Sequence, residues 1–375
     1  FPMTAQYDIV VVFWGEAFSA RFFRFCLASL LAPGNIPALS EASIVRLVPV
    51  TRAADWQEVS DHPLVREVAE WVEVEPIFFS PEETRDKYAA MSLGHAIALE
   101  RAYSCRRRCI PVCPDALLSD GALMEIHRAL EEGAVMVLAP ALRFSEDGNE
   151  RLSGALERAG GGRLALAPRA LVSAVIEAPH HETRAHFWGA KNFSAFPVHC
   201  LWRLPRARGL LVHTYSWAVI GINLPVLPAH DLSTLDHWTM DGDYVYRNCS
   251  DPDALDIVDD SDRLFYVSLT CEAERSLQKG RNPMPYLSLR VSHFSTLMDP
   301  LKRMLFRRRV VIHGEPTDTR ELDVIGAEAS RVLSRVNHPP TKLEHLLWRF
   351  FARGMTGFRT HWSDWITSRL NVWFA

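Results

Sequence analysis

The sequence predicts an α/β protein whose central sheet is mostly parallel, Rossmann-like, and covered by helices on both faces. Two continuous apolar runs, residues 8–13 and 134–139, are typical of parallel strands that are buried on both sides. Segments with helical apolar spacing alternate with such runs as far as residue 139. This alternation is the pattern of a doubly wound sheet.

The first strand, residues 8–13, is followed by a helix over residues 17–31, which repeats apolar side chains at helical spacing. The proline of the Pro81-Glu82-Glu83 stretch opens a further helix, and Gly133 ends the last one before the final strand. The remaining predicted strands cover residues 44–50, 72–79, 109–113 and 134–139, and the remaining predicted helices cover residues 63–72, 87–103 and 122–132.

Regular alternation of strands and helices ends after Arg143, where polar and glycine-rich interruptions begin. The sequence therefore predicts one half over residues 1–145, a second half of the same domain over residues 146–300, and a C-terminal helical extension over residues 301–375. With 48% hydrophobic residues, a chain of 375 residues can bury a large core.

The net charge of −4 excludes a global attraction to nucleic acid, and the arginine runs at 106–108 and 307–309 are too short for binding tails. Seven cysteines without a CxxC pair are typical of a reducing compartment. The apolar run after Asp8 lacks a basic region before it, so we expect a core strand and not a signal peptide. The expected location is the cytoplasm.

An acidic turn follows the apolar run at residues 109–113. It contains Asp115 and Asp120, with Gly121 directly before the predicted helix over residues 122–132. Carboxylates at the carboxyl end of a buried strand face the crevice in which open α/β sheets bind ligands. The alternative is that Asp115 turns the chain after a proline while Asp120 caps the helix, because aspartate is favoured in both positions.

With this order of elements, residues 7–145 resemble the nucleotide-sugar-dependent glycosyltransferases of the GT-A fold. In that family the corresponding turn carries an Asp-x-Asp signature that holds a divalent metal on the donor diphosphate. The resemblance implies transfer of a sugar from a nucleotide-sugar donor to a glycan or glycolipid acceptor, with Mg²⁺ or Mn²⁺ as the possible metal. The chain departs from the signature, since Asp115 and Asp120 are not separated by a single residue.

Four further residues are candidates for the donor side of this site. Trp14 and Glu16 lie in the loop after the first strand, where an indole can stack on a base and a carboxylate can accept from a ribose hydroxyl. Core packing by Trp14 is the alternative. Lys87 and Arg143 are candidates by position to neutralise a diphosphate, and the favoured alternative for each taken singly is a solvated surface charge.

The candidate catalytic base lies on the acceptor side. Asp241 belongs to a literal Asp-x-Asp, at Asp241 and Asp243, and it is the first choice for deprotonating an acceptor hydroxyl. Asp236 is the second choice. His213 and His293 each follow an apolar run, so each is a candidate for the metal site or for a phosphate contact.

The tail over residues 342–375 combines aromatic and leucine side chains at helical spacing with interleaved arginines. This pattern predicts either docking or homo-oligomer contact, or attachment to a membrane surface, at the inner face of a membrane for a cytoplasmic protein. Two other functions stay open, a non-catalytic scaffold or binding protein with a transferase-like fold, and a nucleotidyltransferase. The second lacks a glycine-rich phosphate loop after the first strand.

Overall fold

The computed structural model describes residues 4–147, 149–236, 239–241, 243–273, 282, 284–295, 298–339 and 341. The chain divides into two compact units that alternate along the sequence. The first contains Phe1–Leu142, Asn149–Val175 and Trp217–Leu269, and the second contains Arg143–Gly148, Ile176–Ser216 and Thr270–Ala375. This division differs from the predicted boundaries at residues 145 and 300, because the chain returns to the first unit twice. The predicted tail over residues 342–375 lies outside the described residues.

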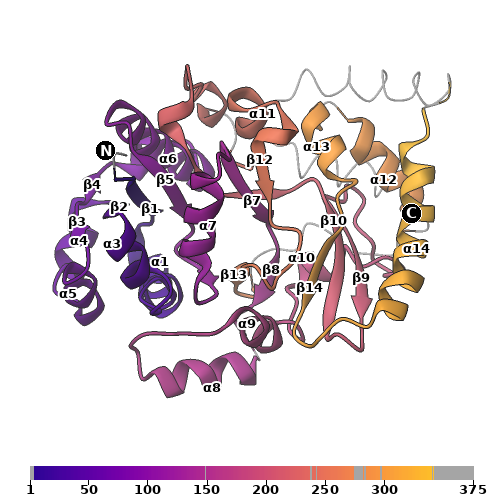
Figure 1. Ribbon diagram of the computed structural model, residues 1–375, viewed down its shortest axis with the longest axis horizontal. Coiled ribbons are helices and arrows are strands. Elements are labelled where there is room, and N and C mark those ends of the chain that lie inside the picture. Colours follow the sequence, from indigo (N-terminus) through magenta and orange to yellow (C-terminus); the bar gives the residue numbers. More distant parts are fainter. Residues whose placement is uncertain are drawn as a thin grey trace. The chain divides into compact units, whose positions relative to one another are not determined.

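The first unit is built on one mixed sheet, most of whose strands are labelled in Figure 1. β1, β2 and β5 run parallel to one another, whereas β11 runs antiparallel between β5 and β7. In spatial order the strands are β12 (Leu255–Ile257), β7 (Met136–Pro140), β11 (Trp217–Ile222), β5 (Arg108–Val112), β1 (Gln6–Val12), β2 (Ile44–Thr51) and β3 (Glu73–Val74), with β4 (Ile77–Phe78) also paired to β2. The predicted α/β sheet is confirmed.

The first unit contains the helices predicted over residues 17–31, 63–72, 87–103 and 122–132, whereas Pro81–Glu83 forms a separate 3-10 turn before α6. The segment over residues 17–31 is continuous but contains a π-helical stretch, and α3 and α4 were not predicted. The helices are α1 (Gly15–Arg21), η1 (Phe22–Leu27), α2 (Ala28–Leu30), α3 (Ile36–Ala42), α4 (Ala53–Val59), α5 (Pro63–Ala69), η2 (Pro81–Glu83), α6 (Lys87–Ser104), α7 (Ala122–Glu131), α8 (Glu150–Ala159), α9 (Pro168–Val175), η3 (Leu224–Val226), η4 (Ser233–Asp236), α11 (Tyr244–Asn248) and η5 (Pro252–Ala254).

Helices cover both faces of this sheet, as the alternation of side chains along β1 shows. The Tyr7 hydroxyl lies 2.8 Å from Nδ1 of His127 on α7. Val12 lies against Gly94 of α6. Because successive side chains of a strand point to opposite faces, the odd-numbered Tyr7 and the even-numbered Val12 place α7 and α6 on opposite sides.

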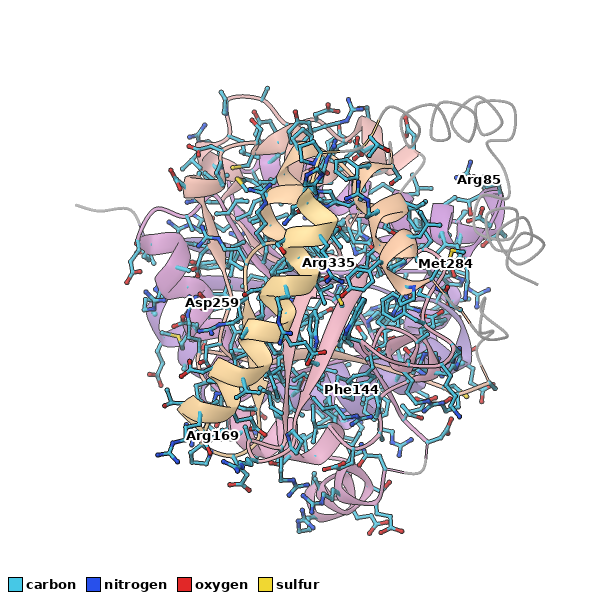
Figure 2. All side chains as sticks on the ribbon, turned by 90° about the vertical axis from the view of Figure 1, so that its right-hand side faces the viewer. Arg85, Phe144, Arg169, Asp259, Met284 and Arg335 are labelled. Carbon is cyan, nitrogen blue, oxygen red and sulfur yellow. The ribbon has the colours of Figure 1, made fainter. Side chains whose placement is uncertain are left out.

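The second unit contains a smaller antiparallel sheet in the order β14-β10-β9. α14 packs on β9 and α12, and Arg335 on α14, labelled in Figure 2, places its guanidinium 5.2 Å from the ring centroid of Tyr286. The elements are β8 (Arg143–Ser145), α10 (His181–Arg184), β9 (His199–Leu204), β10 (Gly209–Thr214), α12 (Pro285–Phe294), α13 (Pro300–Leu305), β14 (Val310–His313) and α14 (Thr319–Asn337). In the first unit, β6 (Ala116–Leu118) pairs antiparallel with β13 (Tyr266–Thr270), whose last residue belongs to the second unit.

The close approach of α6 to β1 depends on Gly94. A Cβ atom at this position would lie 2.5 Å from Cγ1 of Val12. We expect Gly94→Ala to lower the free energy of unfolding by about 1–2 kcal/mol, because overpacking outweighs the gain in helix propensity. Combining it with Val12→Ala makes room for the methyl group, so the double variant loses less stability than the sum of the two single variants. Urea denaturation measures all three.

Gly154 of α8 provides a matched control for this prediction. A Cβ atom there would meet only the end of the flexible Arg158 side chain, at 3.3 Å from Nη1. Gly154→Ala is therefore expected to stabilise the protein by up to about 1 kcal/mol. Equal effects of the two alanine substitutions would contradict the proposed close contact between α6 and β1.

Candidate functional site

The candidate site of the first unit lies at one edge of its sheet. Val12 pairs in register with Val50, and Val11 with Val112, so β1, β2 and β5 end at the same edge. Ligands of open α/β sheets bind outside this carboxyl edge. Trp14 follows the end of β1 and Asp115 follows the end of β5, so the chain brings both predicted residues to this edge.

The Trp14 side chain is half-buried at the start of α1. Its ring meets Phe79 edge to face at a centroid distance of 5.8 Å, and its centroid lies 6.5 Å from that of Phe18. These contacts hold one part of the indole by packing and leave another part exposed. Glu16 is exposed in the first turn of α1. Base stacking by Trp14 and ribose binding by Glu16 remain predictions.

A buried carboxylate that sequence reasoning missed holds the loop after β1 in place. Asp55 of α4 accepts a hydrogen bond of 2.9 Å from the Gly15 amide and two hydrogen bonds from the Arg52 guanidinium. Its hydrogen bonds to Arg52 lower the pKa of the Asp55 carboxyl, so the group stays charged. The sequence signal that could have identified Asp55 is an acidic residue in the first turn of a helix that directly follows a strand.

Lys87 is exposed at the first position of α6. This helix starts on the carboxyl side of the sheet, because it connects the end of β4 to the start of β5. Asp86 caps the helix by accepting from the Tyr88 and Ala89 amides. The Lys87 ammonium lies 5.1 Å from the Tyr88 ring centroid, so a cation stands beside the amino end of α6.

His95 lies two turns further along α6 and was not among the predicted site residues. Its side chain is 6% exposed, and burial lowers its pKa to about 4, against the opposing effect of the Asp241 charge. Its Nδ1 atom is buried and has no hydrogen-bond partner among the described residues. Asp241 is exposed and interacts with the Thr239 hydroxyl. The structure thus brings a neutral imidazole near the predicted base, whereas Asp236 is exposed at the end of η4.

Asp115 and Asp120 lie at opposite ends of β6. Asp115 is half-buried in the turn before this strand, and its carbonyl accepts from the Leu269 amide at 2.9 Å. Asp120 accepts a 2.6 Å hydrogen bond from the Gly34 amide through Oδ1. Asp120 does not cap the helix, since α7 begins at Ala122 and its N-cap residue is Gly121, which makes no side-chain hydrogen bond. The carboxylate of Asp120 instead joins two loops.

A joint metal site was expected from Asp115 and Asp120. About 10 Å of strand separates them, whereas the oxygens around one ion lie within about 5 Å of one another. Within the described ranges, the groups of three or more histidine, cysteine and acidic side chains that are close enough to share an ion contain neither aspartate. Asp115 and Asp120 flank β6 and do not share one turn, so a metal site shared by these two residues stays a prediction.

The other two predicted metal ligands belong to the core of the second unit. Nδ1 of His213 lies 3.0 Å from the Phe306 carbonyl oxygen, and Nδ1 of His293 lies 2.9 Å from the Tyr215 hydroxyl. Burial lowers the pKa of each imidazole to about 4. Both imidazoles are buried and hydrogen-bonded within the second unit, and within the described ranges neither belongs to a group of three close potential ligands, so their role as metal ligands stays a prediction. Arg143 also belongs to this unit, where it pairs with Glu182 at 3.1 Å.

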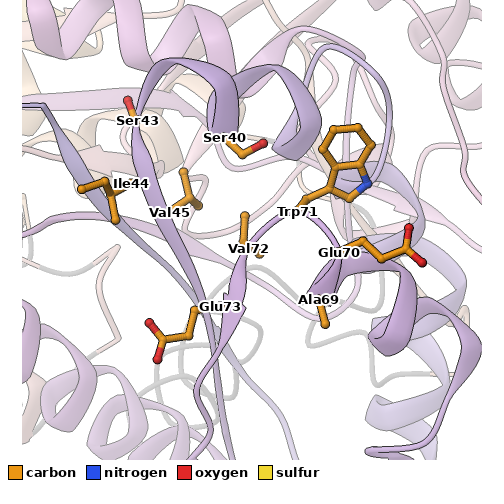
Figure 3. A pocket seen from close by; sticks show the side chains of 9 residues that line it. All are labelled: Ser40, Ser43, Ile44, Val45, Ala69, Glu70, Trp71, Val72 and Glu73. Carbon is orange, nitrogen blue, oxygen red and sulfur yellow. The ribbon is translucent and has the colours of Figure 1, made fainter.

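A hollow of about 390 Å³ opens at the opposite edge of the first sheet. Figure 3 shows its lining, which comes from the end of α3, the start of β2 and the segment between α5 and β3. Because β2 begins here, the hollow lies at the amino edge of the parallel strands. Its position does not match the crevice in which open α/β sheets bind ligands.

Neither a protein-family model nor a curated protein matches this sequence. Solved structures do match part of it. Mouse xyloside xylosyltransferase 1 is 14% identical, with a TM-score of 0.25 over 36% of this chain and 53% of that chain. A putative glucose-1-phosphate thymidylyltransferase from Bacillus anthracis is 9% identical, with a TM-score of 0.25 over 38% and 56%. A mannose-1-phosphate geranyltransferase from Thermus thermophilus is 15% identical, with a TM-score of 0.21 over 38% and 42%.

All three matched structures are named transferases, and the chain spans about half the length of the first two. At these identities and TM-scores the likeness carries no argument about activity, and the fold is argued from the strand pairing above. Within the described ranges, every helix is too short or too polar to cross a lipid bilayer.

The contact between Asp120 and Gly34 predicts a loss of stability. Asp120→Ala leaves the Gly34 amide without its acceptor, and we expect the free energy of unfolding to fall by about 1–3 kcal/mol. Asp120→Asn keeps an acceptor oxygen and should lose less. Urea denaturation measures both. An Asp120→Ala variant with unchanged stability would contradict the structural role.

Buried neutral histidines predict an acid-sensitive second unit. The folded-state pKa of His293 is about 4, below the ordinary value of 6.5. Its stabilising contribution is therefore present above about pH 6.5 and is lost as the pH falls toward 4, by about 1.4 kcal/mol per pH unit for one proton. His293→Gln keeps an acceptor for the Tyr215 hydroxyl, so the pH slope of the unfolding free energy should decrease by about one proton.

Denaturant titrations between pH 7 and pH 5 measure this slope. His338 is exposed after the end of α14, so His338→Ala provides the control and should leave the slope unchanged. If His293→Gln keeps the full slope of the unsubstituted protein, the assignment of His293 as a buried neutral group is wrong.

Proposed function

We propose that this protein is a glycosyltransferase that moves a sugar from a nucleotide-sugar donor to a hydroxyl group of a glycan or glycolipid acceptor. The observation that carries the proposal is the position of Asp115, whose half-buried side chain follows β5 at the edge where β1 and β2 also end. This is the edge at which open α/β sheets bind ligands. The proposed place of action is the cytoplasm, at the inner face of a membrane where the acceptor is a glycolipid.

The proposed donor contacts use residues around this edge. Trp14 stacks on the base through the exposed part of its indole, and Glu16 accepts from a ribose hydroxyl. Lys87, beside the amino end of α6, neutralises charge that develops on the diphosphate leaving group. Asp115 orients the sugar or the diphosphate. Arg143 is bound to Glu182 in the second unit, so we give it no step in the reaction.

The proposed general base is Asp241, with Asp236 as the second choice. A base must lie within about 3 Å of the acceptor hydroxyl, and the exposed carboxylate of Asp241 is accessible to a bound acceptor. The neutral His95 imidazole beside it has an Nδ1 atom with no partner among the described residues. Burial that lowers the pKa of His95 to about 4 keeps this imidazole neutral, so we give it no proton-transfer step.

The divalent metal implied by the GT-A resemblance does not fit the residues predicted to hold it. Asp120 is bonded to the Gly34 amide, and His213 and His293 belong to the core of the other unit. Asp115 supplies a carboxylate at the site but forms no described three-ligand group with its neighbours. We therefore derive no step that uses Mg²⁺ or Mn²⁺.

Asp115→Asn tests the proposed function. We expect sugar transfer to fall at least about 100-fold, because the substitution removes a charge at the reacting centre. The melting temperature should stay within a few degrees, as expected for a half-buried turn residue. A thermal-shift screen with UDP-, GDP- and CMP-sugars, with and without Mn²⁺, identifies the donor, and chromatography of the products measures transfer.

Asp120→Asn is the matched control, because the structure gives this aspartate a role in loop stability. It should keep donor binding and transfer at a temperature where it is folded. If no nucleotide sugar shifts the melting temperature of the unsubstituted protein, the result contradicts the proposal and favours a non-catalytic binding protein.

A further inference from the structure

Three chain segments of the second unit lie side by side: β8, the segment that leads into α10, and the chain that leaves β13. The Ser145 amide donates to the Ala178 carbonyl at 2.7 Å, and the His180 amide donates to the Arg143 carbonyl at 3.3 Å. The segment that leads into α10 therefore runs along β8. On its other side, His180 reaches the Cys271 carbonyl in the chain that leaves β13. These contacts belong to the second unit and include none of the residues proposed for sugar transfer.

Potential metal ligands from two of these segments converge. His180, His181 and Glu272 each offer one ligand atom, and these atoms lie within 4.8 Å of one another. The two imidazole rings have a centroid distance of 3.9 Å. The ligand atoms of one ion with bonds of about 2.0–2.2 Å lie within a similar span, so small side-chain rotations bring all three onto one ion.

The hydrogen bonds of His180 orient one ring nitrogen toward a ligand. Its Nε2 lies 3.2 Å from the Cys271 carbonyl oxygen, which requires Nε2–H to donate and leaves the lone pair on Nδ1. At Nδ1 the Glu182 amide is 3.4 Å away, which is long for a hydrogen bond. Donation of the second ring N–H to a backbone carbonyl is the arrangement found around metal-binding histidines.

His181 has an unsatisfied nitrogen. Its Nδ1 lies 3.3 Å from Oε2 of Glu272, so Nδ1–H donates to this carboxylate and the lone pair is on Nε2. Nε2 is buried and has no hydrogen-bond partner in the described part of the chain. The ring nitrogen that faces Glu272 is Nδ1, so an ion shared with this carboxylate would replace the Nδ1 proton.

A second group of ligand atoms, from Glu146, Asp147 and Cys271, adjoins the first. The Glu272 amide donates to Oδ2 of Asp147 at 2.9 Å, so the two groups are linked through one peptide. Glu146 and Asp147 add negative charge that favours a cation. The imidazole ligands determine which metal ion the site prefers. Imidazole nitrogen suits Zn²⁺ and other first-row transition metal ions, and it does not suit Mg²⁺.

Arg184 is the competing cation. Its guanidinium lies 3.1 and 3.0 Å from the two oxygens of Glu272. The Arg184 side chain is 48% exposed, and an ion pair of this exposure contributes little to stability. A metal ion can therefore displace the guanidinium from one carboxylate oxygen at small cost.

We propose that His180, His181 and Glu272 bind a first-row transition metal ion of the Zn²⁺ type, with water at the remaining coordination position. Three protein ligands and an open position make up a tetrahedral zinc site. The site would join the segment before α10 to the chain that leaves β13. The proposal does not rest on sugar transfer, and its failure would leave the proposed function unaffected.

Titration calorimetry of Zn²⁺ into the chelator-treated full chain tests the proposal. We expect one ion per chain, with an affinity that falls about 10-fold or more in His181→Ala and in Glu272→Gln. Co²⁺ in place of Zn²⁺ should give the visible absorption of a four-coordinate site. Glu272→Gln changes a partly exposed side chain, so this variant still tests metal binding if His181→Ala does not fold. Far-UV circular dichroism checks the fold of both.

Two further variants complete the experiment. His338→Ala removes an exposed histidine outside the cluster and should leave Zn²⁺ affinity unchanged. Arg184→Gln removes the competing cation and should increase Zn²⁺ affinity several-fold, whereas a purely structural ion-pair network would gain nothing from it. Absence of Zn²⁺ binding in the unsubstituted protein, or binding that persists in both His181→Ala and Glu272→Gln, would overturn the proposal.

Discussion

The buried carboxylate of Asp8 is the interaction on which the central sheet depends. It is 2% exposed on β1, where Arg46 of β2 donates hydrogen bonds of 2.9 and 2.8 Å and Arg107, directly before β5, donates one of 2.5 Å. Arg107 also donates to the Tyr7 and Ile44 carbonyls, so one guanidinium joins all three strands. Removing one partner from such a buried pair costs about 3–5 kcal/mol, which strongly favours this single register.

A fixed register at one edge of a sheet determines what meets at the other. Because β1, β2 and β5 are aligned at Asp8, the loops that follow them emerge together, with Trp14 after β1 and Asp115 after β5. Two further carboxylates then hold neighbouring loops through backbone amides, Asp55 at Gly15 and Asp120 at Gly34. The candidate site therefore includes half-buried groups on loops that carboxylates hold through backbone amides.

The sequence predicted the elements whose signal is local. The strand over residues 8–13 and the helix over 87–103 were recognisable because their apolar spacing is regular. The two interleaved units were not, since local periodicity does not show that the chain returns to the first sheet at Trp217. For the same reason the positions of Trp14 and Asp115 after their strands were predictable, whereas the approach of His95 to Asp241, more than a hundred residues away, was not.

The histidines show why residue type and burial together do not assign a role. His213 and His293 are buried with ring nitrogens that lie within hydrogen-bond distance of core groups, so the lone pairs and N–H groups are used within the fold. His95 and His181 are also largely removed from water, but each retains a buried nitrogen with no partner among the described residues. An unpaired buried nitrogen costs free energy in the folded protein. The unsatisfied atom, and not the apolar run before the residue, is therefore the signal that separates candidate functional histidines from structural ones.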